Sequence, residues 1–462
     1  MSTTEHNDIL FLNFNQSGSC LAVGTSQGFK ILNCEPFGEF YSEIHDEGSG
    51  GYNIVEMLFS TSLVTLIGNG DNPDFSPRTL KIINTKKEST ICKISFPTPI
   101  QSVRMNKTHL VALLRTQIYV YDITTLKLLH VIEIDWNPHC VMTLSPNIKN
   151  NILGFPSSIK ILLNARIVKN DVIVSKGINI SSNEGVSDSI TQLKENSTTL
   201  KGNVVIYDLS ILQPRIIIEA HESEIAALTF SSDGTLLATA SVKGTIIRVF
   251  NCTSGLRCYQ FRRGTYQTRI LSMNFSNNNQ FLAVTCSNGT IHIFKLNLNT
   301  NNNNNNNPTV NEEEVTGMNT YTSFRNIGPH VDEGRNTVSR IIRNSSQQLS
   351  RKAMQAIGQM LPSSVTSAWD PMRHFASCKL PQSQTAYETS AVFIDSYKEI
   401  DIQSYRDLFG NGLEDIPLPS ASEVTKVHIV PVRVGDPNGF LHEYILDPER
   451  GGDCPLLSSY PL

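Results

Sequence analysis

Two adjacent arginines, Arg262 and Arg263, have the clearest capacity for chemistry in this chain, and they lie between Phe261 and Gly264. Adjacent side chains of an extended strand point to opposite faces. If this stretch is a strand, two guanidinium groups therefore point in opposite directions. Guanidinium groups form paired hydrogen bonds with phosphates, so the arrangement suits a protein that holds two separate anions, one on each side of a single backbone. The alternative is two solvated surface arginines, because most arginines are exposed.

Composition limits the class of protein to which these arginines belong. The chain has 462 residues, of which 39% are hydrophobic, and a formal net charge of −4. It is long enough to bury a large core, and its mild acidity gives no general attraction to nucleic acid or membranes. Any anion binding must therefore come from local clusters of cations, and we expect no nucleic-acid partner.

The cysteines and the polar start of the sequence limit cofactors and location. The nine cysteines are scattered and are never spaced as C-x-x-C, which argues against a disulfide framework or a zinc site and favours a reducing compartment. We expect no metal and no cofactor. The sequence shows no secretory signal pattern and no apolar run near the roughly 20 residues that a transmembrane helix needs, so any contact with lipid would be peripheral.

An internal repeat predicts the fold. Three segments superimpose without gaps, each with a Leu-Ala pair seven residues after a phenylalanine and a glycine fourteen residues after it: residues 14–28, 230–244 and 275–289. The last two begin 45 residues apart, which is the length of a propeller blade. Each repeat predicts three strands, which in the second copy are residues 225–230, 236–240 and 246–250. Four weaker copies bring the total to seven. We therefore predict an all-β, seven-bladed β-propeller that occupies residues 1–462 as a single domain.

Three insertions interrupt the predicted blades. Residues 168–202, in the fourth blade, are rich in Ser, Asn, Thr, Gly and Lys and predict a disordered loop. Residues 296–372, in the sixth blade, contain an unbroken asparagine run at 301–307, to which we assign no chemistry. Residues 401–420 form a further polar loop.

The sixth-blade insertion contains one stretch with helical periodicity, residues 338–361. Apolar residues recur there at steps of three, four and seven, and no acidic residue occurs between Arg335 and Pro362. A basic amphipathic helix is typical of membrane surfaces and partner-binding segments. Its moderate hydrophobicity makes the helix marginal in water alone, which favours folding on lipid over constant packing on the propeller. The candidate membrane-insertion residues are Ile342, Leu349, Arg340, Arg343, Arg351 and Lys352.

The predicted blades place other polar side chains on either side of the arginine pair. On the Arg262 side, the preceding blade supplies His221, Ser241, Lys243, Thr245 and Arg248; on the Arg263 side, the following blade supplies Thr265, Thr268, Arg269, Ser287, Thr290 and His292. Hydroxyl groups add directional donors, and a histidine can add charge near neutrality. Each residue taken singly could be ordinary turn chemistry or a structural histidine. Their convergence on one arginine pair favours anion binding.

These features together resemble the PROPPIN family, β-propellers that bind polyphosphoinositides. The resemblance rests on Phe261, Arg262, Arg263 and Gly264 in a seven-repeat propeller with a long insertion in the sixth repeat. It is strongest to the founding fungal autophagy-related member and covers nearly the full chain. Supporting segments are residues 33–38, 50–52, 82–87, 374–377 and 447–454.

The resemblance implies two lipid pockets on the propeller rim, each binding phosphatidylinositol 3-phosphate or phosphatidylinositol 3,5-bisphosphate. Site 1 would comprise Arg262, His221, Ser241, Thr245 and Arg248; site 2 would comprise Arg263, Thr268, Ser287, Thr290 and His292. The family's sixth-blade loop contacts the bilayer and forms an amphipathic helix there, which matches residues 338–361. The chain departs from the family's common Ser-Ala-Thr-Arg run at residues 265–269, so the role of Gln267 stays open.

The resemblance also implies partners and a location. In the autophagy branch a loop of the second blade recruits a lipid-transfer protein, and Pro77 and Arg78 are the corresponding candidates here. A vacuolar phosphoinositide-kinase regulatory complex is a further candidate partner. The expected location is cytoplasmic, with peripheral attachment to preautophagosomal, vacuolar and endosomal membranes. No enzyme is expected, since no catalytic arrangement emerges from the repeat. The alternative function is a protein-interaction scaffold that does not bind lipid directly.

Overall fold

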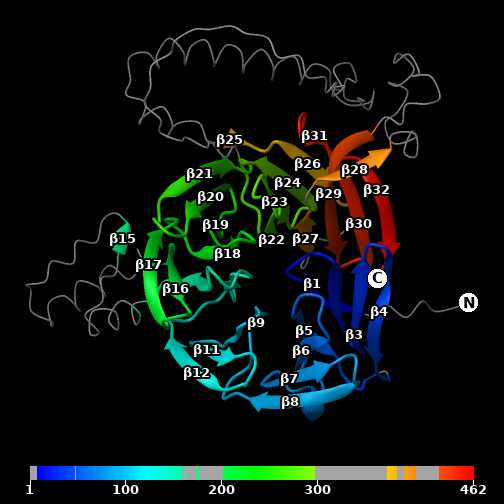
Figure 1. Cartoon of the computed structure of the whole chain (residues 1–462), viewed down its shortest axis with the longest axis vertical. Coiled ribbons are helices and arrows are strands. Elements are labelled where there is room, and N and C mark those ends of the chain that lie inside the picture. Colours follow the sequence, from blue (N-terminus) through cyan, green and yellow to red (C-terminus); the bar gives the residue numbers. More distant parts are fainter. Residues whose placement is uncertain are drawn as a thin grey trace, which may run out of the picture. The chain divides into compact units, whose positions relative to one another are not determined.

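The computed structural model describes residues 8–46, 48–158, 161, 173–175, 201–296, 372–381, 390–395, 397–401 and 426–462. The chain divides into two units. The first comprises residues 1–296, 371–398 and 429–462 and contains the blades; the second comprises 297–370 and 399–428 and lies almost wholly outside the described residues. Among the described residues, seven mainly antiparallel sheets follow one another around a ring, which confirms the predicted seven-bladed propeller (Figure 1).

Blades 1 to 4 are formed by the N-terminal half of the ring. Blade 1 comprises β1 (Ile9–Phe14), β2 (Cys20–Thr25), β3 (Gly28–Cys34) and β4 (Phe37–Ile44). Blade 2 comprises β5 (Tyr52–Met57), β6 (Leu63–Gly68), the 3-10 helix η1 (Pro73–Phe75), β7 (Thr79–Asn84) and β8 (Ser89–Ser95). Blade 3 comprises β9 (Ser102–Met105), β10 (His109–Leu113), β11 (Gln117–Asp122) and β12 (Leu128–Glu133). Blade 4 comprises β13 (Thr143–Leu144), β14 (Ile152–Pro156), β16 (Asn203–Asp208) and β17 (Gln213–Glu219).

Blades 5 to 7 complete the ring. Blade 5 comprises β18 (Ile225–Phe230), β19 (Leu236–Ser241), β20 (Ile246–Asn251) and β21 (Arg257–Arg262). Blade 6 comprises β22 (Ile270–Phe275), β23 (Phe281–Cys286), β24 (Thr290–Lys295) and β26 (Ala376–Lys379). Blade 7 comprises β27 (Ala391–Ile394), β29 (Lys426–Asp436), β30 (Phe440–Leu446) and β32 (Leu456–Pro461), and β28 (Lys398–Asp401) pairs with β29.

The outer edges of three blades carry an additional short strand. β15 (Ile173–Ser175), β25 (Met372–Arg373) and β31 (Gly452–Asp453) pair in parallel with β17, β21 and β26, the outer strands of blades 4, 5 and 6. β25 directly follows the long sixth-blade insertion and nevertheless joins blade 5. The segment that leaves the insertion is therefore bound to the strand that ends in Arg262.

The repeat predicted three strands in each blade, and the structure has four. The inner strands follow the prediction closely, because their continuous apolar runs are buried on both faces, as in β2 and β23. The fourth, outer strand of each blade was not predicted, because it faces solvent. β8, for example, is mostly exposed along its length. Sequence periodicity detects a strand by the surface that it buries, so a largely exposed outer strand gives little signal.

The apolar core lies between neighbouring blades, and one of its layers sets the orientation of β21. Phe261 is fully buried between blades 5 and 6, where its ring stacks on Phe294 with centroids 4.7 Å apart. Burying such a side chain contributes about 1.5–3 kcal/mol to the free energy of unfolding. Because alternate residues of a strand face opposite sides, this anchor directs Arg262 away from blade 6.

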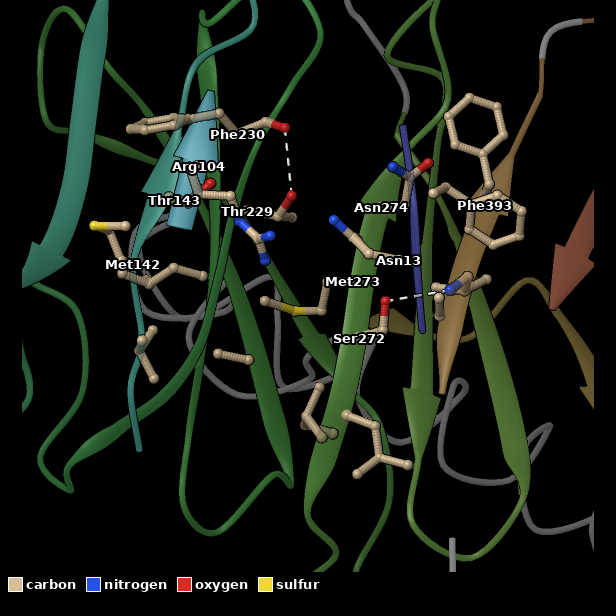
Figure 2. A pocket seen from close by; sticks show the side chains of 18 of the residues that line it. Asn13, Arg104, Met142, Thr143, Thr229, Phe230, Ser272, Met273, Asn274 and Phe393 are labelled. Carbon is tan, nitrogen blue, oxygen red and sulfur yellow. Dashed lines mark hydrogen bonds between the residues drawn. The ribbon is translucent and has the colours of Figure 1, made fainter. Parts of the chain in front are cut away.

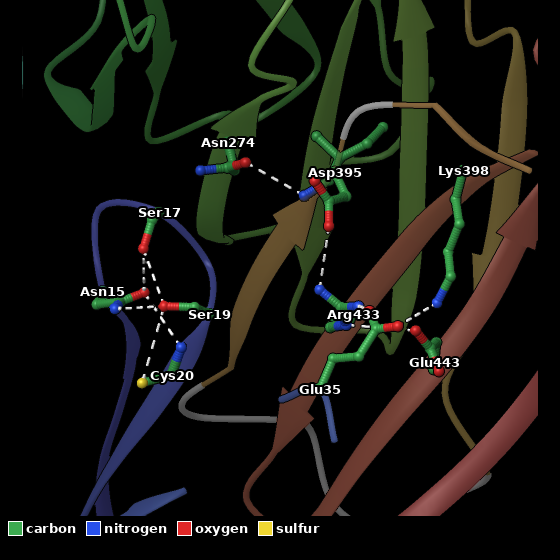
Figure 3. Close-up of polar contacts among 11 residues, drawn as sticks. Asn15, Ser17, Ser19, Cys20, Glu35, Asn274, Asp395, Lys398, Arg433 and Glu443 are labelled. Carbon is green, nitrogen blue, oxygen red and sulfur yellow. Dashed lines mark hydrogen bonds and ion pairs between the residues drawn. The ribbon is translucent and has the colours of Figure 1, made fainter. Parts of the chain in front are cut away.

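An ion network joins the last blade to the first. Arg433 of β29 contacts Glu35, which lies between β3 and β4, and also Asp395 and Glu443 of blade 7 (Figure 3). The ring is thus closed by charged contacts in addition to apolar ones.

The three predicted insertions lie almost wholly outside the described residues. This applies to most of the predicted loop at 168–202, to the insertion at 296–372 with its predicted helix at 338–361, and to the polar loop at 401–420. Within the described part of the chain, no helix is both long enough and apolar enough to cross a membrane.

Candidate anion-binding site

The two central arginines lie in different surroundings. Arg262 ends β21, opposite Ile246 of β20, and its side chain is exposed. Arg263 follows the strand and is buried, with 7% of its surface accessible. Gln260 and Arg262 share the face of β21 opposite to Phe261, and Gln260 is paired with Arg248. Arg262 therefore lies on the side of blade 5 that faces blade 4, whereas Arg263 lies on the side of blade 6.

A polar cluster lies on the Arg262 side, between blades 4 and 5. The Arg248 guanidinium donates from Nε to Oε1 of Gln260 at 2.9 Å, and from a terminal nitrogen to the carbonyl of Ala220 at 2.6 Å. The same nitrogen lies 3.4 Å from Nδ1 of His221. Nε2 of His221 lies 2.9 Å from the hydroxyl of Thr239, which donates onward to the carbonyl of Arg248 at 3.3 Å. This chain of bonds assigns the neutral His221 ring its proton on Nε2.

The charge state of His221 differs from the expectation. Burial, together with the neighbouring Arg248 cation, lowers the pKa of His221 from 6.5 to about 3. The histidine is therefore neutral at pH 7. A phosphate placed beside it would favour the protonated form. The low pKa of His221 was not predictable from the sequence, because burial of the ring depends on packing between blades.

Two hydroxyls predicted for site 1 flank the turn between β19 and β20. Ser241 is the last residue of β19 and is buried, and Thr245 is half-buried just before β20. The carbonyl of Thr245 accepts the backbone N–H of Arg263 at 2.9 Å. Gly244 has a φ of +58°, and a Cβ there would lie 1.9 Å from the carbonyl of Thr268. The turn is thus pressed against the segment that begins site 2, and only glycine fits it.

Arg263 is held by backbone carbonyls on the blade 6 side. Its Nε donates to the carbonyl of Gly244 at 2.8 Å, and a terminal nitrogen donates to the carbonyl of Tyr266. The positive charge of Arg263 opposes the rise that burial causes in the pKa of Cys286 on β23. The same charge contributes to the lowered pKa of His292 on β24. These contacts fix the position of the guanidinium group.

His292 is the second histidine of the predicted sites and is buried beside Arg263. Burial and the charges of His374 and Arg263 lower the pKa of His292 from 6.5 to about 4, so this ring is also neutral at pH 7. Its Nδ1 is buried and has no hydrogen-bond partner among the described residues. Buried polar atoms without partners are rare in folded proteins, so Nδ1 has spare capacity to bond a ligand or a water.

The remaining predicted site 2 residues lie around the same edge of blade 6. Thr268 lies between β21 and β22, Ser287 follows β23, and Thr290 begins β24. The backbone N–H of Ser287 bonds the carbonyl of Arg269 at 3.0 Å, and that of Thr268 bonds the carbonyl of Lys243 at 3.3 Å. The structure thus gathers the predicted residues at the junctions of blades 4, 5 and 6.

The sequence missed two residues of this rim. Arg373 lies in β25 directly opposite Arg262, and the ring of His374 lies with its centroid 5.0 Å from that of His292. Both follow Arg262 by about 110 residues, across the sixth-blade insertion. Only the strand pairing of β25 with β21 reveals that they lie beside the two sites. Local sequence carried no signal of that pairing.

The candidate partner loop lies far from this rim in the chain, between η1 and β7 of blade 2. The carbonyl of Pro77 accepts the N–H of Ile100 at 2.9 Å, and the carbonyl of Arg78 accepts the N–H of Phe96 at 2.9 Å. These bonds hold the backbone, while the side chain of Arg78 is exposed. The loop therefore has a backbone held by hydrogen bonds and an exposed cationic side chain at Arg78.

A cavity of about 630 Å³ occupies the centre of the propeller, lined by the first strands of the blades (Figure 2). Glu56 is buried there, and burial raises its pKa despite the opposing effect of Arg104. The Arg104 guanidinium lies 3.0 Å from the Glu56 carboxylate, and the Asn13 amide donates to the same oxygen at 2.9 Å. Glu56 and Arg104, which face each other in the central channel, thus form an ion pair with one another.

Comparison with known proteins matches the chain to one family. The model of the family described as PROPPIN matches residues 9–199 and 178–320. Autophagy-related protein 18 of Saccharomyces cerevisiae strain S288c is 45% identical over 496 aligned residues, covering 98% of each chain. Autophagy-related protein 18 of Kluyveromyces lactis is 46% identical over 503 aligned residues, again covering 98% of each.

Two solved structures have a fold similar to that of this chain. The structure described as the complex of KlAtg21 with the coiled coil of AgAtg16 matches with a TM-score of 0.60 at 24% identity, over 98% of this chain and 99% of that one. Kluyveromyces lactis Hsv2 matches with a TM-score of 0.59 at 15% identity, with the same coverage. At these identities the likeness shows the propeller fold alone.

Proposed function

The chain belongs to the PROPPIN family of β-propellers, and on this premise we propose that it is a peripheral membrane protein that binds phosphoinositide headgroups at two sites on its rim. The ligands are phosphatidylinositol 3-phosphate and phosphatidylinositol 3,5-bisphosphate. The observation that carries the proposal is the arrangement of Arg262 and Arg263. Adjacent in the chain, they are directed by the buried Phe261 anchor to different blade junctions, each with a histidine and hydroxyl groups.

The two sites differ in how their arginines are prepared for a ligand. Arg263 is buried and held by two carbonyls, whereas Arg262 is exposed. A phosphate monoester carries about −1.5 to −2 charges at pH 7, which suits a guanidinium with neighbouring hydroxyl donors. Nδ1 of His292, which has no hydrogen-bond partner in the described part of the chain, supports a ligand on the Arg263 side. Two sites on one rigid rim make capture of the second lipid intramolecular.

The same proposal extends to partners and location. Relatives that match the full chain are named for autophagy, and a structural neighbour was solved with the coiled coil of another protein. We assign partner recruitment, including an autophagy lipid-transfer protein, to the blade 2 loop with Pro77 and the exposed Arg78. A vacuolar phosphoinositide-kinase regulatory complex is a further proposed partner. The proposed location is the cytoplasmic face of preautophagosomal, vacuolar and endosomal membranes.

A vesicle panel tests the lipid function directly. The full chain is floated with vesicles that are identical except for the phosphoinositide that each contains. We expect recovery with the 3-phosphate and the 3,5-bisphosphate vesicles, and little with vesicles that carry unphosphorylated phosphatidylinositol. Soluble headgroups titrated in parallel should bind with a stoichiometry of two. A chain that binds neither lipid nor headgroup would be the scaffold without direct lipid binding.

A separate prediction concerns membrane attachment by the predicted helix of the sixth-blade insertion. Replacing Ile342 and Leu349 with aspartate should weaken vesicle binding about tenfold or more, because each buried apolar side chain contributes about 1.5–3 kcal/mol. Headgroup affinity in solution should not change. The matched control replaces Asn344 and Gln348 with aspartate, which adds the same charge to the other side of the predicted helix at 100° per residue. Equal losses from both variants, or a loss of headgroup affinity, would contradict membrane insertion by this segment.

A further inference from the structure

The strand pairing of β25 places a third arginine at site 1. Parallel strands align Arg373 with Arg262, and Met372 with Phe261. Residues directly opposite one another on neighbouring strands share a face of the sheet. Since Phe261 faces blade 6, both Arg262 and Arg373 lie on the face toward blade 4.

Among the described residues, no carboxylate neutralises these two adjacent cations. Both side chains are exposed, and among the described residues neither has a carboxylate within 4.0 Å. Neighbouring strands are about 4.8 Å apart, and like charges directly opposite one another destabilise a sheet. An anion between them replaces this repulsion with charge-assisted hydrogen bonds.

The other arginines of the two predicted sites are already engaged. Arg248 donates to Gln260 and to the carbonyl of Ala220, and Arg263 donates to the carbonyls of Gly244 and Tyr266. Arg262 and Arg373 are thus the pair of site 1 cations whose forks are open to solvent. One fork matches one phosphate bidentately, so two adjacent forks match two phosphates on one ring.

We propose that Arg373 makes site 1 a two-phosphate site, in which Arg262 holds the 3-phosphate and Arg373 holds the 5-phosphate of the same inositol headgroup. This inference rests on the proposed lipid function and assigns its selectivity. The two phosphates flank the 4-hydroxyl of the ring, so both reach one side of the headgroup. Preference for the 3,5-bisphosphate over the 3-phosphate then depends on Arg373 of β25, the strand that follows the sixth-blade insertion.

The test uses two soluble headgroups and the full chain. Inositol 1,3-bisphosphate represents the 3-phosphate lipid, and inositol 1,3,5-trisphosphate represents the 3,5-bisphosphate lipid; both are titrated by calorimetry. We expect Arg373→Gln to weaken trisphosphate binding at one of the two sites about tenfold, and to change binding of the bisphosphate by less than about twofold. Arg373→Lys should recover part of the loss, because lysine keeps the charge but not the fork.

A matched control separates this effect from net charge. Arg115→Gln removes the same charge from an exposed position on blade 3 and should leave both affinities unchanged. Since Arg373 and Arg115 are both exposed, both variants should melt near the wild-type temperature. Equal losses for the two headgroups in Arg373→Gln, or no loss for either, would overturn the inference while leaving the lipid function intact. Wild-type protein that binds neither headgroup would overturn the lipid function itself.

Discussion

Replacing Arg262 and Arg263 together with threonine should reduce binding to vesicles containing phosphatidylinositol 3-phosphate by about a hundredfold or more. Each site then lacks its central guanidinium, and threonine offers only a single neutral hydroxyl. The loss exceeds that at either site alone, because linking two sites on one rim raises overall affinity by about 10²–10⁴ when both engage. Vesicle flotation at matched lipid composition measures the effect, with soluble headgroup titration as the monovalent reference.

The single variants separate binding from folding. Arg262 is exposed, so Arg262→Thr should leave the melting temperature near that of the wild type. Arg263→Thr leaves the carbonyls of Gly244 and Tyr266 without their donor in a buried place, which costs about 1–3 kcal/mol of unfolding free energy. Binding by the double variant must therefore be measured well below its thermal transition.

Replacing either arginine alone should also lower the binding stoichiometry. We expect either single variant to titrate with one headgroup per chain, and to keep weak vesicle binding that disappears in the double variant. Flotation of a folded double variant at the wild-type level would reject the two-site model. A single variant that loses both headgroups at once would show instead that the two arginines form one site.

The blades could be predicted from sequence because their inner strands repeat a buried pattern. The three strands predicted at 225–230, 236–240 and 246–250 correspond to β18, β19 and β20 within one residue at each end. Glycine at the end of the repeat is required by geometry, as the close approach of Gly244 to Thr268 shows. Patterns that arise from burial and turn geometry are local, so a single sequence displays them.

The candidate sites were only partly predictable, for two physical reasons. The alternation of Arg262 and Arg263 follows from strand geometry, but the burial that keeps His221 and His292 neutral depends on packing between blades. The second reason is pairing at long range. Arg373 joins Arg262 only because β25 crosses from the sixth-blade insertion to the edge of blade 5, and no local pattern specifies such a crossing.

Replacing Arg433 with methionine should lower the free energy of unfolding by about 3–5 kcal/mol, since removing one partner leaves charges buried and uncompensated. The Arg433 side chain is 4% exposed, and its guanidinium lies 2.8 Å from Glu35, 3.2 Å from Asp395 and 3.3 Å from Glu443 (Figure 3). Glu35 is half-exposed and partly screened by water, so most of the loss comes from Glu443 and Asp395. Urea denaturation measures the change.

Lys398 supplies the matched control for this network. It also contacts Glu35, but both side chains of that pair are well exposed, so Lys398→Met should cost less than about 1 kcal/mol. Adding Glu443→Gln to Arg433→Met should recover part of the stability, because it removes the carboxylate that the first change leaves unpaired. A loss in Arg433→Met no larger than that in Lys398→Met would contradict a stabilising role for the network.

Ring closure and lipid binding should respond independently. Arg433 joins blades 7 and 1, whereas the arginine sites lie at the junctions of blades 4, 5 and 6. Arg433→Met should therefore keep the wild-type headgroup affinity at temperatures where it is folded, although it unfolds at lower urea concentration. Arg262→Thr should show the reverse, with wild-type stability and weakened binding. A loss of headgroup affinity in folded Arg433→Met would mean that closure of the ring sets the geometry of the distant rim.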